Sequence, residues 1–168
     1  MEEAGTLPLR VYLTVDYSDL ASGVAPPSGA TGRVGGLLKC DRVKLFSDGS
    51  LGAETAAIRG KYNTEDGEER TATTSRDGEE GVLIQPADEL AAKMADAKRK
   101  GYRLEIHAIG DRAAATVLDG LEATGVTAED RAVMTHCQLL GADLIERMAA
   151  MQCVANIQVS PKSPLPRK

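Results

Sequence analysis

The chain has 168 residues, about one domain, and 42% of them are hydrophobic, enough for a packed core. Its formal net charge of −5 argues against a nucleic-acid partner, and no apolar run is long enough to span a membrane. The N-terminus lacks the basic-then-apolar order of a signal peptide, and the three cysteines have no CxxC spacing. We therefore expect a cytoplasmic protein with free, buried thiols, because a reducing compartment disfavours disulfides.

The first half of the chain contains two predicted strands separated by loops. Residues 7–15 are rich in β-branched side chains and predict a strand. Residues 18–36 are rich in Gly, Ser and Pro and predict a loop with room for a short helical turn; no Gly-Lys-Ser/Thr follows, which argues against a phosphate-binding loop. Residues 42–46 predict a second strand. Residues 53–84 are polar with charged, Gly-containing turns, and predict a long excursion with room for a hairpin over one face.

The second half alternates between helices and strands. Helices are predicted at 86–100, 111–123 and 141–151, and strands at 102–108, 132–135 and 153–159. The first of these helices is the clearest, because acidic residues begin it, basic residues end it and Gly101 stops it. The apolar stripes expected to face the core are Leu90, Met94 and Ala97; Ala114, Val117, Leu118 and Leu121; and Leu144, Met148 and Met151.

This alternation predicts an α/β fold with a parallel sheet and right-handed crossovers. The last three strands are near-continuous apolar runs, so we expect both of their faces to be covered. Either a small open sheet or part of a (β/α)8 barrel satisfies the pattern. Residues 160–168 are rich in proline, which lacks a backbone donor, and predict an irregular tail.

The chain's only two histidines stand at equivalent places. His107 and His136 each end an apolar strand, and each is followed by a helix. Neighbouring parallel strands lie about 4.8 Å apart, so two such side chains could reach one metal ion. A pair of ordinary hydrogen-bonded histidines also satisfies the pattern, although the matched positions favour a functional site at the strand C-termini.

Three further residues are candidates for chemistry. Lys44 lies in mid-strand between apolar neighbours, and its side chain faces the opposite side from theirs. It could snorkel to solvent, act as an amine of depressed pKa, or become a modified lysine that bridges metals. Asp48 and Asp111 each follow a strand end, where an N-cap is the commonest role of aspartate. We predict the cap for Asp111, whereas Asp48 could instead orient a ligand or substrate.

Three motifs in order resemble the YtcJ-like branch of the metal-dependent amidohydrolases. They are Val-Lys-Leu-Phe-Ser-Asp-Gly-Ser-Leu-Gly at 43–52 with Thr-Ala-Ala at 55–57, Ile-His-Ala-Ile-Gly-Asp-Arg-Ala at 106–113, and Thr-His-Cys-Gln at 135–138 preceded by Arg131. The resemblance spans most of residues 7–158. It implies a (β/α)8, TIM-like barrel, of which this chain would supply about strands 3 to 7.

The resemblance also implies a site and a reaction. One or two divalent metal ions, usually zinc, would be held at the strand C-termini, with Lys44, His107 and His136 among the ligands. The lysine would be carboxylated and bridge two metals. The metal would lower the pKa of water and polarise a carbonyl, for hydrolysis of a carbon–nitrogen bond in an amide-like, non-peptide small molecule. Asp48 is our candidate catalytic residue beside these ligands.

The sequence also departs from the family pattern. Upstream of residue 7 there is no His-x-His pair, and downstream there is no strand-8 aspartate to act as ligand and general base. The family's small β-sandwich is absent, and the basic, proline-rich end after Gln158 resembles that of a truncated gene model. We therefore expect residues 1–168 to form a partial catalytic domain with half of the usual ligands, weakly active or inactive.

Two other functions compete with this one. The chain could be a catalytically dead α/β remnant that binds a small molecule, a metal or a partner. A redox or nucleophilic cysteine protein is a third possibility, which would require a thiol of low pKa. In each case, five strands of an eight-stranded barrel would leave open edges, and we expect self-association or assembly with a complementing fragment.

Overall fold

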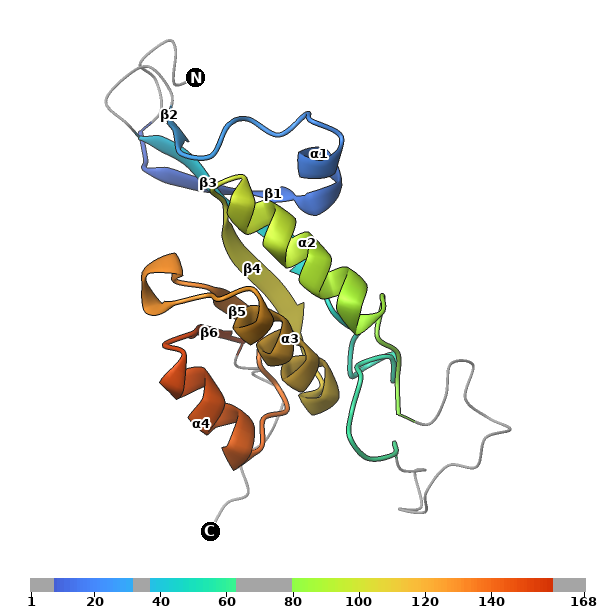
Figure 1. Ribbon diagram of the computed structural model, residues 1–168. Coiled ribbons are helices and arrows are strands. Elements are labelled where there is room, and N and C mark those ends of the chain that lie inside the picture. Colours follow the sequence, from blue (N-terminus) through green and yellow to red (C-terminus); the bar gives the residue numbers. More distant parts are fainter. Residues whose placement is uncertain (1–7, 32–36, 63–79, 159–168) are drawn as a thin grey trace.

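The computed structural model of the chain describes residues 8–31, 37–62 and 80–158 (Figure 1). Five strands form one sheet in the spatial order β1-β3-β4-β5-β6, and each neighbouring pair is parallel. These strands are β1 (Val11–Asp16), β3 (Leu38–Phe46), β4 (Arg103–Ala108), β5 (Val133–His136) and β6 (Val154–Ile157). The two-residue strand β2 (Ala30–Thr31) pairs antiparallel with β3. The predicted parallel α/β sheet is confirmed.

Three long helices cover one face of this sheet (Figure 1). They are α2 (Ala87–Arg99), α3 (Asp111–Ala123) and α4 (Ala142–Ala150); a short helix α1 (Tyr17–Ala21) and a 3-10 turn η1 (Ala128–Asp130) complete the helical elements of the described residues. An open doubly wound sheet carries helices on both faces, whereas a barrel carries them only outside. The described sheet is therefore an arc of a (β/α)8 barrel, with an outer, helix-covered face and an inner face.

The core lies between the helices and the outer face of the sheet. Along β4, Leu104, Ile106 and Ala108 are buried, as is Met134 on β5. The predicted stripes of α2 and α3 are fully buried, and so are Leu144 and Met148 of α4, whereas Met151 is only partly buried. Burial of each large aliphatic side chain contributes about 1.5–3 kcal/mol, so the helices are held by this one continuous core.

The inner face of the sheet differs from our expectation. We predicted that the last three strands would be covered on both faces, and this is wrong. On β4 the alternate residues Arg103, Glu105 and His107 are half-buried, and all four residues of β6 are exposed.

The loops and strand boundaries show several smaller differences. The predicted loop 18–36 contains most of α1, which is the short helical turn expected there, and also β2. Strand β3 begins at Leu38 rather than at residue 42 because it pairs with both β1 and β2. The two ends of the excursion 53–84 are joined by backbone hydrogen bonds, including Ile58 N–H to the Glu80 carbonyl at 2.8 Å. Residues 63–79 of this excursion and the tail 160–168 lie outside the described residues, so the hairpin predicted within 53–84 stays a prediction.

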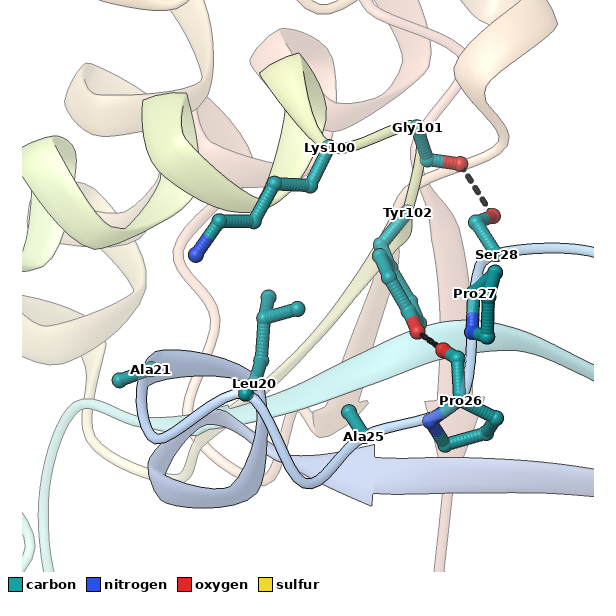
Figure 2. A pocket seen from close by; sticks show the side chains of 10 residues that line it. Leu20, Ala21, Ala25, Pro26, Pro27, Ser28, Lys100, Gly101 and Tyr102 are labelled. Atoms are coloured by element: carbon teal, nitrogen blue, oxygen red, sulfur yellow. Dashed lines mark hydrogen bonds between the residues drawn. The ribbon is translucent and has the colours of Figure 1, made fainter.

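At the N-terminal end of the strands lies an open cavity of about 630 Å³, between the segment after α1 and the end of α2 (Figure 2). The Tyr102 hydroxyl donates to the Pro26 carbonyl, and the Ser28 hydroxyl donates to the Gly101 carbonyl at 2.5 Å. Tyr102 precedes β4, so this cavity lies at the opposite end of the sheet from His107. No helix of the described residues is both long and apolar enough to cross a membrane.

Candidate functional site

The two histidines meet at the C-terminal ends of β4 and β5. Their ring centroids lie 4.6 Å apart, with the rings at 71° to each other. The period of two in a strand would place His136 with Met134 on the helix-covered face. Instead, His136 has a left-handed backbone with φ of 81°, and its ring lies against that of His107. The structure therefore brings together the pair that the sequence predicted to share a site.

The backbone around His136 is strained. Cys137 is also left-handed, with φ of 48°, and each non-glycine residue in this region costs about 1–3 kcal/mol. Hydrogen bonds from Cys137 N–H to the Ala108 carbonyl and from Leu139 N–H to the Ile109 carbonyl, both 3.0 Å, hold the segment in place. Such strain is concentrated at functional sites in proteins, which supports a functional reading of this strand end.

Each imidazole has one nitrogen engaged by an acceptor. His107 Nε2 lies 2.9 Å from the Gly49 carbonyl oxygen and 3.2 Å from Asp48 Oδ1. His136 Nδ1 lies 2.6 Å from the side-chain oxygen of Gln158. Since all three oxygens accept, these nitrogens carry the protons. This leaves Nδ1 of His107 and Nε2 of His136 as lone-pair donors, with no hydrogen-bond partner among the described residues.

Asp48 lies directly behind His107 and is almost completely buried, with 1% of its surface exposed. Its carboxylate accepts from the backbone N–H groups of Ala57 (3.0 Å), Ile109 (3.1 Å) and Gly110 (2.8 Å). No described helix begins at Asp48, so the N-cap alternative for this residue is wrong. Its catalytic role stays a prediction.

Asp111 is not the N-cap of α3 that we predicted. The cap is Gly110, and Asp111 is the first residue of the helix, where its carboxylate accepts from the N–H groups of Arg112 (3.0 Å) and Arg59 (2.8 Å). A different group occupies the capping position: the Ala57 carbonyl accepts from two N–H groups in the first turn of α3, each at 3.2 Å. The prediction was off by one residue because the group that caps the helix is a backbone carbonyl from a distant loop, and not a side chain at the start of the helix.

Lys44 lies on the inner face, and its amine binds Glu105 at 3.1 Å. It is not extended to solvent, so the snorkelling alternative is not what the structure shows. No contact in the described part of the chain joins its amine to either histidine. Glu105 also accepts from the hydroxyls of Thr14 (3.2 Å) and Thr135 (3.3 Å).

Glu105 is therefore the residue that sequence reasoning missed. Its position two residues before His107, on the same strand face, was the available signal. Burial would raise the pKa of Glu105, but the hydrogen bond and charge of Lys44, with the two threonine hydrogen bonds, outweigh burial and lower the pKa below its usual value. Glu105 is thus an anion, and it pairs with the Lys44 amine.

A cavity of about 220 Å³ opens beside Lys44, lined in part by Tyr17, Phe46, Ile84 and Lys93. The ring of Phe46 lies 5.6 Å from that of His107 and 5.7 Å from the Lys44 amine, so the cavity adjoins the inner-face polar residues. It has room for a small organic group beside Lys44 and Phe46.

Two further observations bear on alternative chemistries. In residues 8–31, 37–62 and 80–158, no three His, Cys, Asp or Glu side chains are grouped so that they could hold a metal ion. A metal site on the histidine pair would therefore need a ligand of another type, such as Lys44, or a ligand from outside these residues. Burial raises the pKa of Cys137 and of Cys153 to about 11, and burial also raises the pKa of Cys40, which disfavours a thiolate nucleophile.

Comparisons with known proteins agree on one family. The sequence model of the family described as "Amidohydrolase family" matches residues 1–164. The Bacillus subtilis (strain 168) protein named "Putative amidohydrolase YtcJ" is 30% identical over 116 residues, which are 69% of this chain and 20% of that protein.

Two crystal structures are similar to this fold. They are uncharacterized metal-dependent hydrolases from Pyrococcus furiosus (TM-score 0.73) and Pyrococcus horikoshii OT3 (TM-score 0.74), each 29% identical. Each comparison covers 93% of this chain but only 30% and 29% of the respective structures. The chain thus spans about a fifth to a third of the relatives it matches. With the family match covering nearly its whole length, the chain belongs to the amidohydrolase family.

Proposed function

We propose that this chain carries the central part of a divalent-metal site of a hydrolase, with His107, His136 and Lys44 as ligands and zinc as the metal. The observation that carries the proposal is the histidine pair itself. Two rings 4.6 Å apart each have one nitrogen engaged by an acceptor and the other left with a lone pair. Metal-bound histidines characteristically have this arrangement, because the second nitrogen's hydrogen bond orients the ring.

Two neutral imidazoles are too few for a zinc site, which takes at least three protein ligands. Lys44 lies on the same inner face, two residues before the Phe46 position that pairs with His107. While its amine is paired with Glu105, Lys44 is not a metal ligand. Carboxylation of its amine would replace the cation with an anionic oxygen donor, the type of group that zinc accepts. The donor set present therefore fits one metal ion with further ligands supplied from outside the described residues.

The reaction proposed for the site is hydrolysis of a carbon–nitrogen bond in a small, amide-like, non-peptide substrate. When bound, the metal would supply Lewis-acid catalysis and activation of water. The chain's own residues would orient the ligands and provide the cavity beside Lys44 for part of the substrate. Because the chain spans only part of its relatives, we expect weak or no activity from the chain alone.

The metal content of the purified chain tests this proposal. After incubation with zinc and bicarbonate and then dialysis, we expect about one zinc per chain by elemental analysis. The variants His136→Ala and Lys44→Ala should bind zinc at least about tenfold more weakly, since each removes a ligand. Lys93→Ala is the matched control, because it removes a lysine that lines the same cavity but is not a proposed ligand.

Two results would contradict the proposal: wild-type chain without zinc, or Lys44→Ala retaining zinc as well as wild type does. The second candidate, a catalytically dead α/β remnant, is favoured by one observation, the engagement of Lys44 by Glu105. It predicts negligible zinc and no hydrolysis of amides or esters, so the same measurement decides between the two.

A further inference from the structure

The buried carboxylate of Asp48 lies close to His107 and accepts hydrogen bonds from the backbone of two other segments of the chain. One oxygen, Oδ1, accepts from the N–H of Ile109 and lies 3.2 Å from His107 Nε2, whose hydrogen bond is to the Gly49 carbonyl. The other, Oδ2, accepts from the N–H groups of Ala57 and Gly110. The side chain itself has 0% of its surface exposed. A group so enclosed does not touch a substrate.

Three backbone N–H groups and, at 3.2 Å, the ring nitrogen of His107 surround this carboxylate. An ionised carboxylate has about four lone-pair sites and no hydrogen to donate. An asparagine side chain at the same position has one accepting atom, and its NH₂ group would face either the N–H groups of Ala57 and Gly110 or the ring N–H of His107. Because each of these neighbours is a donor, the arrangement fits a side chain at position 48 that only accepts, and a proton on His107 Nε2 that is donated to the Gly49 carbonyl.

We propose that Asp48 is a positioning residue that fixes His107 as its Nε2–H tautomer and so presents Nδ1 to the site. The Gly49 carbonyl, at 2.9 Å from the same nitrogen, aligns the ring, and Asp48 adds the charge that favours the proton there. The consequence for metal binding rests on the proposed function above, whereas the tautomer is a property of the metal-free chain.

The same contacts connect two of the sequence motifs, the one at 43–52 and the one at 106–113. Asp48 belongs to the stretch after β3, and Ile109 and Gly110 belong to the stretch after β4. Its carboxylate joins these stretches and anchors His107 between them. A displacement of the loop after β3 would therefore change the orientation of the histidine on β4.

Nitrogen-15 NMR of the chelator-treated, histidine-labelled chain tests this role, since the two neutral tautomers have distinct ring-nitrogen shifts. The spectrum is recorded about two pH units above the ordinary histidine pKa of about 6.5. With two histidines in the chain, the His136→Gln variant assigns the signals. We expect wild-type His107 to be the Nε2–H tautomer, and Asp48→Asn to give a mixture of tautomers.

Asp41→Asn is the matched control. Asp41 is another buried carboxylate and lies within β3. It pairs with Lys39 at 2.8 Å and Arg103 at 3.6 Å, away from the histidines. This variant should keep the His107 tautomer of wild type. Zinc titration of the same proteins provides a second readout, with Asp48→Asn expected to bind about 10–100-fold more weakly than Asp41→Asn.

The outcomes separate the two proposals. An Nδ1–H tautomer of His107 in wild type overturns the positioning role, even if Asp48→Asn fails to fold. Retention of a single Nε2–H tautomer in folded Asp48→Asn also overturns it, because the Gly49 carbonyl would then suffice. A wild-type chain with the expected tautomer that binds no zinc refutes the metal site and leaves the role of Asp48 in fixing the tautomer supported.

Discussion

At the scale of single residues, the inner face is organised by charge. Glu105 on β4 gathers hydrogen bonds from β1, β3 and β5, and its partner Lys44 is about as enclosed as it is, with side-chain exposures of 21% and 19%. A pair so enclosed is not a surface salt bridge, whose contribution is small. Removing one member of the pair leaves the other charge desolvated and without a partner, and this lowers the stability of the fold.

Glu105→Gln should therefore destabilise the chain at neutral pH by about 1–3 kcal/mol. The pKa of Glu105 is lowered in the folded state, so its contribution is fully present above its ordinary pKa of about 4.3 and is lost as the pH falls through the lower folded-state value. The stability difference between wild type and variant should thus be large at pH 7 and shrink below about pH 4. Urea unfolding across this range, at one protein concentration, measures it.

Glu89→Gln is the control for this experiment. Glu89 also pairs with a lysine, Lys93, but on the exposed surface of α2, where its side chain is 52% exposed. Its substitution should cost at most about 0.5 kcal/mol. Equal effects of the two substitutions, or an effect of Glu105→Gln that does not depend on pH, would show that the inner-face pair is unimportant.

At the scale of elements, the junction between the loop after β3 and the start of α3 decides the geometry of the site. The Ala57 carbonyl caps α3, and the approach is so close that a Cβ on Gly110 would lie 1.8 Å from that oxygen. Glycine is required here for space and not for backbone conformation, since its φ of −79° is ordinary. Helix start, loop and His107 are thus one packed unit.

Gly110→Ala should disrupt the packing between the start of α3 and the loop that contains Ala57. The added methyl group meets backbone and not a flexible side chain, so we expect a loss of about 1–3 kcal/mol of unfolding free energy and a weakened contact between Asp48 and His107. Thermal unfolding measures the first effect. Gly60→Ala, on the same loop but with no atom within 4 Å of the new Cβ, should be neutral. A variant Gly110→Ala as stable as wild type would refute the close packing.

At the scale of the whole molecule, the sheet formed by residues 8–31, 37–62 and 80–158 has two open edges and an inner face that none of the described helices covers. Among these residues β1 and β6 each pair on one side only, and apolar side chains stand exposed on both, among them Tyr12 at 62% and Ile157 at 62%. Exposed edges of this kind pair with other strands. We therefore expect the chain to self-associate, or to bind a fragment that supplies the neighbouring strands of the barrel.

Sedimentation velocity over a range of concentrations tests this expectation. Wild type should show concentration-dependent association, and Ile157→Lys, which places a charge on the β6 edge, should reduce it. Ile145→Lys is the matched control, because Ile145 is a similarly exposed isoleucine (54%) on helix α4. A wild-type chain that stays monomeric at all concentrations would contradict the expectation.

The amino-acid sequence by itself determined the order and type of the main elements and the candidate histidines. Helix stripes and strand runs are local patterns, and helix α3 was predicted at the residues where it lies, Asp111–Ala123. The shared place of His107 and His136 also followed from local signals, since parallel strands end at one edge of the sheet.

Only the tertiary structure decided which faces are covered, and how the site is held. The choice between open sheet and barrel depends on which face the helices take, which a strand pattern does not encode. The ring contact of the histidines depends on a left-handed residue at a strand end, and the burial of Asp48 and the engagement of Lys44 depend on partners about 60 residues away in the chain. These are long-range contacts, and the local propensities of the residues do not predict them.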